Sequence, residues 1–375
     1  MKLTRIGVLI LVLLTTLFYL GAGNAVFASD TIKIGLAGPF SGDLAPYGIP
    51  PKDTVRLAAE VLNRSGGLLG KQVQILAEDD QCKAGTATNV ASKLVGEGVI
   101  AVIGHICSGA TIAAMSVYRA VKIPVISPSA TNPSLTLENK NPNFFRTIPH
   151  DAAQANLQVD FITRHLKAKK VAIVHDKGDY GKGLATLVAE GLKQKKVEIV
   201  IFEGITPGAV DYSALIRKVK HANPDVVAFG GYHPEGSKIV TQARKRNIKA
   251  SFISGDGLKD PSFIKIGRKF VEGYYVSSPA DISKVEISRE ITRILKSKNQ
   301  KAGNFGLQAH AAVTAIFNAV KKTNSTDPEK LQKALRSEKI DTTLGMISFD
   351  KNGDILGSGF SMYQVRDGQF VPVKW

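Results

Sequence analysis

The sequence predicts an α/β protein with two lobes, each built on a parallel β-sheet. Short runs rich in β-branched residues end in Gly, Pro or Asp and alternate with helical patterns. Strands that alternate with helices form right-handed βαβ units, and these units give parallel sheets. The alternating series occurs twice, and a chain of 375 residues exceeds one ordinary hydrophobic core, so we expect two similar lobes.

The first series predicts five strands and a helix. The helix covers 50–67, where PPKDTVRLAAEVLNRSGG opens on prolines and is stopped by glycines. The expected strands are TIKIGLAGP (31–39), KQVQILAEDD (71–80), GVIAVIGH (98–105), KIPVISPSA (122–130) and NFFRTIP (143–149).

The second series repeats this arrangement. Its expected helix is GKGLATLVAEGLKQ (181–194). Its expected strands are KKVAIVHDK (169–177), VEIVIFEGI (197–205), PDVVAFGGY (224–232), ASFISGDG (250–257) and EGYYVSS (272–278).

The remaining chain predicts two long helices, over 284–299 and 305–323, followed by a β segment over 342–373. NGD and RDG within that segment mark hairpin turns. DKNGD (350–354) matches a calcium loop only in part, because Ile355 and Ser361 stand where Gly and Glu are needed, so we interpret it as a plain turn. No linker rich in Pro and Ser separates the halves, which favours several crossovers between the lobes over a single tether.

Residues 1–28 predict a secretory signal peptide. MKLTR supplies two positive charges, the stretch from Ile6 to Leu20 is mostly apolar, and Val26 and Ala28 are small residues suited to cleavage after Ala28. An uncleaved membrane anchor is the alternative, because the apolar stretch approaches transmembrane length. No cysteine follows the cleavage point, so lipid anchoring is not indicated.

The formal net charge is +17, and loss of the leader removes two basic residues. The basic clusters KAKK (167–170), KQKK (193–196) and RKR (244–246) lie at or just beyond the ends of predicted helices, where cations favour the helix dipole and solvation. No recognition motif and no aromatic-interleaved basic stripe accompanies them, so we expect no nucleic-acid partner. The charge favours solubility and nonspecific attraction to anionic surfaces.

Catalytic and metal-binding motifs are not found in the sequence. It contains no G-x-S-x-G, H-E-x-x-H, Walker or G-x-G-x-x-G motif, and its seven histidines have no ligand spacing. His105, His175 and His233 each follow a strand, where satisfied hydrogen bonding explains them better than a site. We therefore expect a protein that is not an enzyme and has no cofactor and no metal.

The stretch GHICSGATIAA (104–114) admits three interpretations: a nucleophile, half of a metal site, or a pocket wall. Cysteines of an exported protein meet an oxidising environment, so the two cysteines of this chain, Cys82 and Cys107, predict a disulfide. Such a bridge closes a loop of about 25 residues and stabilises the fold by about 3.5 kcal/mol in the chain-entropy model. Because ligands bind beyond the carboxyl ends of parallel strands, this bridge would stiffen a pocket wall.

Seven blocks in order resemble the periplasmic leucine/isoleucine/valine-binding protein family, the substrate-binding component of branched-chain amino acid ABC importers. The resemblance runs from about Thr31 nearly to the C-terminus. The blocks are YG at 47, EDDQC (78–82), VIGHICSGAT (102–111), SPSAT (127–131), AIVHDKGDYGKGLA (172–185), GGYHPE (230–235) and GMISFDKNGD (345–354).

The resemblance implies the type I periplasmic binding protein fold, two doubly wound lobes joined by three crossovers that close like a Venus flytrap. The N-terminal lobe would hold 29–150 and 279–356, and the C-terminal lobe 151–278 and 357–375. It also implies a monomer in the periplasm, with L-leucine, L-isoleucine or L-valine as ligand and ABC transporter permease subunits as partners.

The same resemblance implies a ligand site. The hydroxyl and N–H groups of Ser108 and Thr131 would receive the ligand's α-carboxylate, and the carbonyl of Ser129 would accept from its ammonium. Asp256 matches the family's acidic residue, but the family carries Glu there, one methylene longer, so this departure bears on the exact ligand. A turn aspartate between glycines is the alternative interpretation of Asp256.

Aromatic residues complete the implied site. Tyr47 and Tyr232 would enclose the ligand side chain, Ile106 and Phe305 would add apolar surface, and Tyr180 would help to close the lobes. The expected function is capture of a branched-chain or related aliphatic L-amino acid. The alternatives are a sensory module of the same fold that recognises amides, aromatic acids or other metabolites, and an enzyme, which the missing motifs disfavour.

Overall fold

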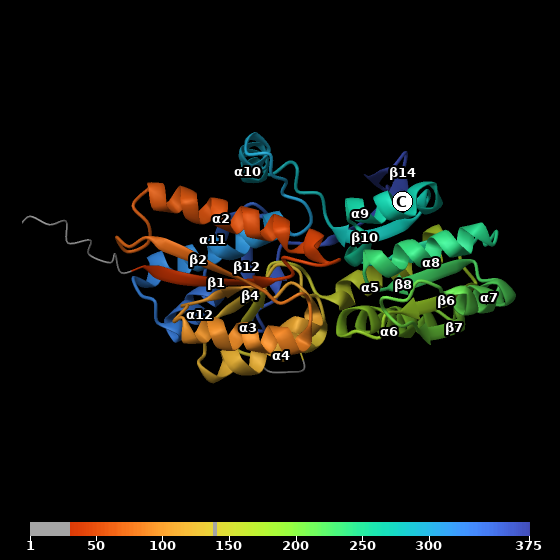
Figure 1. Ribbon diagram of the computed structural model, residues 1–375, viewed down its shortest axis with the longest axis horizontal. Coiled ribbons are helices and arrows are strands. Elements are labelled where there is room, and N and C mark those ends of the chain that lie inside the picture. The colour runs from red at the N-terminus through yellow and green to blue at the C-terminus, as the bar shows by residue number, and fades with distance from the viewer. Residues whose placement is uncertain (1–30, 138–140) are drawn as a thin grey trace, which may run out of the picture.

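The computed structural model describes residues 31–137 and 141–375 and places them in two lobes side by side (Figure 1). The predicted signal peptide and its cleavage point after Ala28 lie outside these residues. Across the described ranges, no helix has the length and apolarity needed to cross a membrane.

The first lobe is built on a five-stranded parallel sheet of order β2-β1-β3-β4-β5. Its third, fourth and fifth strands are shorter than predicted at both ends, and Ile106, Ser108 and Ser129, which follow β3 and β4, lie at the site described below. Its strands are β1 (Ile32–Gly38), β2 (Val73–Asp79), β3 (Val102–Ile103), β4 (Val125–Ser127) and β5 (Phe144–Arg146).

The second lobe is built on a seven-stranded sheet of order β15-β14-β10-β9-β8-β6-β7. β6 to β10 are parallel, whereas β14 pairs antiparallel with β10 and β15 pairs antiparallel with β14. This sheet is therefore mixed: the chain returns to it at β14, and the RDG hairpin then joins β14 to β15. Its strands are β6 (Lys170–His175), β7 (Glu198–Gly204), β8 (Val226–Gly230), β9 (Ser251–Ser254), β10 (Tyr275–Pro279), β14 (Phe360–Arg366) and β15 (Gln369–Pro372).

Helices cover both faces of each sheet, as a doubly wound fold requires (Figure 1). The four helices predicted by range are present within two residues at their starts and three at their ends. The helices are α2 (Ile49–Arg64), α3 (Ala84–Gly96), α4 (Ser108–Ala120), α5 (Asp151–Asp160), α6 (Asp179–Gln194), α7 (Ser213–Ala222), α8 (His233–Lys245), α9 (Pro261–Gly267), α10 (Glu286–Ser297), α11 (Gly306–Thr323) and α12 (Pro328–Ser337).

The short helices η1 to η5 connect these elements. They are η1 (Ala45–Tyr47), η2 (Pro133–Leu135), the π-helical turn η3 (Phe161–His165), η4 (Asp256–Leu258) and η5 (Arg268–Val271). A small antiparallel sheet holds β11 (Ile340–Thr342), β12 (Gly345–Phe349) and β13 (Ile355–Leu356), and the NGD turn joins its last two strands as predicted.

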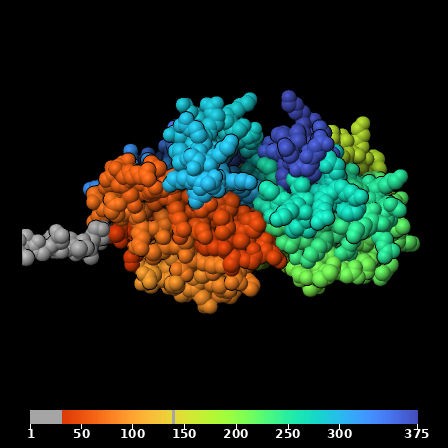
Figure 2. Space-filling model, turned by 45° about the horizontal axis from the view of Figure 1, so that its top comes forward, coloured from red at the N-terminus to blue at the C-terminus, as the bar shows by residue number. Residues whose placement is uncertain are grey.

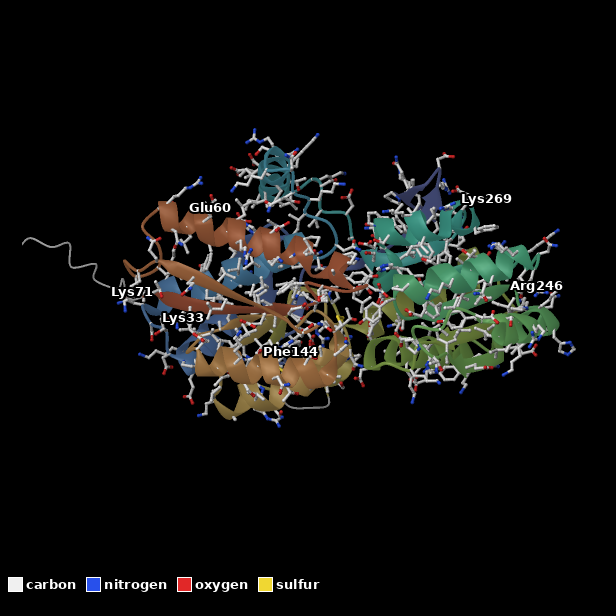
Figure 3. The ribbon with its side chains drawn as sticks, viewed as in Figure 1. Lys33, Glu60, Lys71, Phe144, Arg246 and Lys269 are labelled. Atoms are coloured by element: carbon white, nitrogen blue, oxygen red, sulfur yellow. A yellow bond between two sulfur atoms is a disulfide. The ribbon has the colours of Figure 1, made fainter. Side chains whose placement is uncertain are left out.

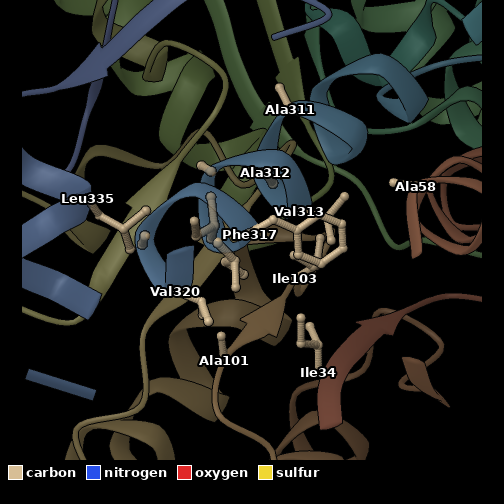
Figure 4. Packing of buried hydrophobic residues seen from close by; sticks show 14 of the residues in the cluster. Ile34, Ala58, Ala101, Ile103, Ala311, Ala312, Val313, Phe317, Val320 and Leu335 are labelled. Atoms are coloured by element: carbon tan, nitrogen blue, oxygen red, sulfur yellow. The ribbon is translucent and has the colours of Figure 1, made fainter. Parts of the chain in front are cut away.

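The chain passes between the lobes three times: between β5 and β6, after β10, and before β14. Late residues consequently share a core with early ones. In Figure 4, Val313 and Phe317 of α11 lie with Ile34 and Ile103 of the first sheet in one buried cluster. Burial of each such side chain contributes about 1.5–3 kcal/mol. The predicted fold, two α/β lobes with several crossovers, is confirmed.

The two lobes are in contact on the face shown in Figure 2. Figure 3 locates their outer ends: Lys33 and Lys71 lie at the end of the first lobe, and Arg246 lies at the end of the second.

The predicted disulfide is present. Cys82 and Cys107 are bonded with a Cα–Cα distance of 5.5 Å, and they join the segment after β2 to the segment before α4. The bridge therefore ties two loops at the carboxyl edge of the first sheet.

Replacing both cysteines by Ser is expected to lower the free energy of unfolding by about 2–4 kcal/mol, because the unfolded chain gains conformational entropy. Urea unfolding monitored by circular dichroism measures this loss. Dithiothreitol should destabilise the parent by the same amount and leave the Ser variant unchanged. Equal stability of parent and variant would contradict the prediction.

Candidate functional site

A small cavity lies where the carboxyl ends of strands from both sheets meet. Its lining includes eight of the nine residues predicted to contact ligand. The lining residues are Tyr47, Ile106, Cys107, Ser108, Ser129, Tyr180, Tyr232, Asp256, Gly257 and Phe305. Open α/β sheets place their ligands at this edge.

Thr131, the ninth predicted residue, does not line the cavity. It is fully buried, its carbonyl accepts the N–H of Asp151 at 2.8 Å, and its Oγ1 has no hydrogen-bond partner among the described residues. It lies one layer behind the cavity wall, at the start of α5.

Neutral hydrogen-bonding groups form one end of the cavity. Ser108 is the first residue of α4, and the first N–H groups of a helix have no partner within the helix. The Oγ of Ser108 accepts the N–H of Asn132 at 3.2 Å, and the Oγ of Ser129 donates to the carbonyl of Ile106 at 2.8 Å. A helix start with a hydroxyl can hold an anion without a counter-cation.

A buried acid from the second lobe also lines the cavity. Asp256 follows β9, and its Oδ1 accepts the Tyr180 hydroxyl at 2.8 Å and the Gln154 side-chain amide at 3.1 Å. Among the described residues, Tyr180 and Gln154 are the side chains that donate to this carboxylate, both at Oδ1. Burial raises the pKa of Asp256, although these two hydrogen bonds oppose the rise. A Cβ at Gly255 would lie 2.5 Å from the Tyr180 Oη, so glycine is needed there for the close approach.

Aromatic rings from both lobes form walls of the cavity. The ring centroid of Tyr47 lies 5.7 Å from that of Tyr232 and 6.3 Å from that of Phe305, while Tyr180 and Tyr232 are 5.3 Å apart. Burial raises the pKa of Tyr47, Tyr180 and Tyr232 well above the usual value, so all three are neutral hydroxyls at physiological pH.

Hydrogen bonds hold the lobes closed over this cavity. The Tyr47 hydroxyl bonds to Nδ1 of His233 at 2.6 Å and to the carbonyl of Gly257. The side-chain amide of Asn132 donates to the carbonyl of Asp179 at 2.7 Å. The cavity volume is about 20 Å³, room for one water molecule, so an amino acid can enter only after the lobes separate.

Asp151 is a site feature that the sequence reasoning missed. It is the first residue of α5 and is fully buried, and the hydroxyl of Thr131 is its polar neighbour, although the two side chains do not reach full hydrogen-bond geometry. Burial, and then the negative charge of Asp256, raise the pKa of Asp151 to about 8. A second buried acid thus lies near Asp256, which itself lines the cavity.

His105 supports the site from outside the cavity lining. His105 is fully buried, with Nδ1 2.6 Å from Oδ2 of Asp80 and Nε2 3.0 Å from the Tyr118 hydroxyl, so it supports the loop before Ser108. Over residues 31–137 and 141–375, no group of three or more His, Cys, Asp or Glu side chains is placed to hold a metal ion.

The raised pKa of Asp151 predicts a pH dependence of stability. Its folded-state value of about 8 exceeds the usual value of about 3.9, so the folded state binds the proton more tightly. Stability is therefore present in full below about pH 4 and is lost as pH rises toward 8. Asp151→Asn should remove this loss, which is at most about 1.4 kcal/mol per pH unit for one proton.

Urea unfolding of the parent and Asp151→Asn at pH 5.5 and 7.5 tests this expectation. The variant should gain stability relative to the parent at the higher pH. Asp225→Asn, at an exposed aspartate, serves as control and should follow the parent's slope. Identical slopes for the parent and Asp151→Asn would mean that Asp151 is ionised in the folded state.

Comparison with known proteins identifies the family. The periplasmic binding protein family profile matches residues 31–369. A leucine-, isoleucine-, valine-, threonine- and alanine-binding protein of Pseudomonas aeruginosa is 36% identical over 345 residues, which cover 92% of each chain. The Leu/Ile/Val-binding protein of Escherichia coli is 35% identical, over 92% of this chain and 93% of its own.

Solved structures agree with this assignment. The branched-chain amino acid transporter substrate-binding protein LivJ of Streptococcus pneumoniae, in complex with isoleucine, has a TM-score of 0.81 and 28% identity, covering 92% of this chain and all of its own. The leucine-binding protein LivK of Thermotoga maritima has a TM-score of 0.85 at 23% identity, over 92% of this chain and 98% of its own, and supports the fold. With its two doubly wound lobes, its interlobe cavity and a family match over nearly the whole described chain, this protein belongs to the periplasmic binding protein family.

Proposed function

We propose that this protein captures an aliphatic L-amino acid, most specifically leucine, isoleucine or valine, between its two lobes. One observation carries the proposal: the cavity has a helix start with a hydroxyl at Ser108, a buried acid at Asp256, and apolar and aromatic walls. The helix start and the acid suit an α-carboxylate and an α-ammonium, and the walls suit a branched aliphatic side chain.

The ligand contacts follow from this arrangement. Ser108 receives the carboxylate through its N–H and hydroxyl, with the Thr131 N–H and hydroxyl behind it, and the Ser129 carbonyl and Asp256 receive the ammonium. Oδ2 of Asp256 remains for the ligand because Tyr180 and Gln154 occupy Oδ1. Tyr47, Tyr232, Ile106 and Phe305 enclose the side chain.

We propose that binding shifts the lobes toward the closed state without chemical change to the ligand. A ligand favours closure only through contacts that the open state lacks, and these contacts come from both lobes. Residues 29–150 with 279–356 would move against 151–278 with 357–375. The assignment of α11 and β12 to the core of the first sheet, and of β14 to the second sheet, supports these bounds.

We further propose delivery of the ligand to the permease of an ABC importer by a monomer in the periplasm, after export through the leader at 1–28. A solved relative described as a branched-chain amino acid transporter substrate-binding protein supports the transport role, and the missing catalytic motifs favour binding over catalysis. A sensory module remains the second candidate because Asp256 is shorter than the family's Glu.

A calorimetric screen of L-amino acids on protein stripped of copurified ligand tests the proposal. L-leucine, L-isoleucine or L-valine should bind saturably, and D-leucine should bind at least about tenfold more weakly, because its ammonium cannot reach Asp256 while its carboxylate stays at Ser108. Binding of amides or aromatic acids without any aliphatic amino acid would favour the sensory module.

A further inference from the structure

One end of the second lobe carries a concentration of exposed cations. β6, β7, β8 and β9 are mutually parallel, so the segments that precede them lie at the same edge of the sheet. We call the exposed cations of these segments the basic end. They are Lys167, Lys169, Lys170, Lys193, Lys195, Lys196, Lys220, Lys245, Arg246 and Lys249.

Few acids offset this charge. Glu198 and Asp225 are the exposed acids of the same segments, and Oδ2 of Asp225 accepts the backbone N–H groups of Lys169 at 2.7 Å and Lys170 at 2.9 Å. Lys195 lies 4.0 Å from Asp160, and among the described residues no other ion pair involves the basic end. The cations are therefore largely uncompensated.

Helix ends explain only part of this charge. The carboxyl ends of α6, α7 and α8 lie at this edge. Each helix dipole places the equivalent of about half a negative elementary charge at its carboxyl end, which favours a nearby cation. Ten cations exceed that need. The second lobe (151–278 and 357–375) contains 23 Lys and Arg against 14 Asp and Glu, and the first lobe (29–150 and 279–356) contains 24 against 18, so the second lobe has the larger excess of positive charge.

A groove of about 480 Å³ opens within the basic end. Lys220 and Lys249 supply cations to its lining, and Asn223 and Asn247 supply amides. Asp225 also lines the groove, and its Oδ2 accepts the backbone N–H groups of Lys169 and Lys170. Val219, Pro224, Ile248 and Ala250 form apolar surface in the same groove. Two lysines beside an apolar floor suit a phosphate that is attached to an apolar body.

The basic end is remote from the amino acid cavity. Asp256 and Tyr232 follow the carboxyl ends of their strands, whereas the basic end precedes the amino ends, and the six residues of β6 alone span about 20 Å. Arg246 marks this outer end in Figure 3, away from the other lobe. Contact through the basic end leaves the cavity and its closure free.

We propose that the basic end docks this protein onto an anionic phospholipid membrane surface, with the groove between Lys220 and Lys249 receiving a headgroup phosphate. A broad row of lysines on short loops fits a broad anionic surface, where each cation contributes about 1 kcal/mol. The four segments, 166–170, 193–198, 219–225 and 244–250, contain no Phe, Tyr or Trp to stack on bases, which disfavours single-stranded nucleic acid. This role is independent of the proposed amino acid binding.

Sedimentation with lipid vesicles tests the proposal. The mature protein should bind vesicles of phosphatidylcholine that contain about 30% phosphatidylglycerol, and it should not bind vesicles of pure phosphatidylcholine. The bound protein should dissociate as the salt concentration rises from about 0.05 to 0.2 M. Lys196→Gln, Lys220→Gln, Arg246→Gln and Lys249→Gln together should lower the partition coefficient at least about tenfold.

A matched variant removes the same charge from the first lobe. It carries Arg289→Gln, Arg293→Gln, Lys330→Gln and Lys333→Gln on the exposed faces of α10 and α12, and it should change the partition coefficient less than about twofold. Equal losses in the two variants would reduce the effect to net charge and overturn the proposal. The proposal would also be overturned if the parent protein did not bind the anionic vesicles, or if it bound duplex DNA more tightly than the vesicles.

Calorimetry with L-leucine separates this inference from the proposed function. Both quadruple variants should bind leucine as the parent does, since none of the eight positions lines the cavity. If the quadruple variant of the basic end loses vesicle binding but binds leucine as the parent does, the result supports the docking role. Inorganic phosphate at millimolar concentration should weaken vesicle binding only as much as its ionic strength does, and full competition would point to a small-anion site instead.

Discussion

Asp256→Ala is expected to weaken binding of L-leucine by about 2–5 kcal/mol, or from about 30-fold to several thousandfold. The substitution leaves a buried ammonium without its carboxylate, and a buried charge without a partner carries the full desolvation cost. Titration calorimetry at pH 7 on stripped protein measures the loss. The Tyr180 hydroxyl and the Gln154 amide also lose their acceptor, so the protein itself should lose stability.

Two further variants sharpen this test. Asp256→Glu restores the length of the family's acid and should keep leucine binding within about tenfold of the parent. Asp260→Ala removes another buried aspartate from the same segment, whose carboxylate caps α9 through the N–H of Ser262, and should cost stability without affecting affinity. Leucine affinity that survives in Asp256→Ala would place the ammonium elsewhere, and the buried acid Asp151 would be the next residue to replace.

The helices and strands of the fold follow from local patterns in the sequence, but the pairing of distant strands does not. The β-branched runs and the helix stops depend on residues a few positions apart, so each of the ten predicted strands and four predicted helices overlaps an observed element, although β3 keeps only two of its eight predicted residues. The RDG hairpin is equally local. That β14 pairs antiparallel with β10, more than 80 residues earlier, depends on the packing of the whole second lobe and has no local signal.

The candidate site divides in the same way. Eight of the residues that the family resemblance predicted line the cavity, and their contact with ligand stays a prediction. Asp151 was missed because an aspartate at the start of a helix normally caps it in contact with water, and the sequence carries no sign that this one is buried. Only the fold, which packs Asp151 behind Thr131 and Asp256, reveals an acid with a raised pKa.

The DKNGD turn shows a second omission. It is a plain turn, as predicted, in which Oδ1 of Asp350 accepts the N–H groups of Asn352 and Asp354. Its last residue nevertheless bonds to Arg146 of β5, since Nε of Arg146 lies 2.5 Å from Oδ1 of Asp354. The two residues are 208 positions apart, so local reasoning about the turn cannot find the pair.

Arg146 connects this turn to the candidate site. Its side chain is fully buried, and Nη1 donates at 3.0 Å to the carbonyls of Ala130 and Asn132, on either side of Thr131. Nη2 donates to the hydroxyl of Thr136. The guanidinium therefore fixes the loop that carries Ser129 and Thr131, although it touches no part of the cavity lining.

Arg146→Met is expected to lower the free energy of unfolding by about 3–5 kcal/mol, because it leaves Asp354 and two loop carbonyls buried without partners. The double variant with Asp354→Leu should lose less than the sum of the single variants, with a coupling energy of about 1–3 kcal/mol in urea unfolding. The exposed pair Lys122–Glu329, removed in the same kind of cycle, should give a coupling energy of at most about 1 kcal/mol.

The same substitution should also weaken ligand binding, because the loop that carries Ser129 and Thr131 loosens. Arg146→Met that remains folded should bind leucine about tenfold more weakly, and the matched Lys122→Met should bind it normally. A coupling energy near zero, or a folded Arg146→Met with parental affinity, would reduce Arg146 to a replaceable buried side chain with no part in ordering the loop.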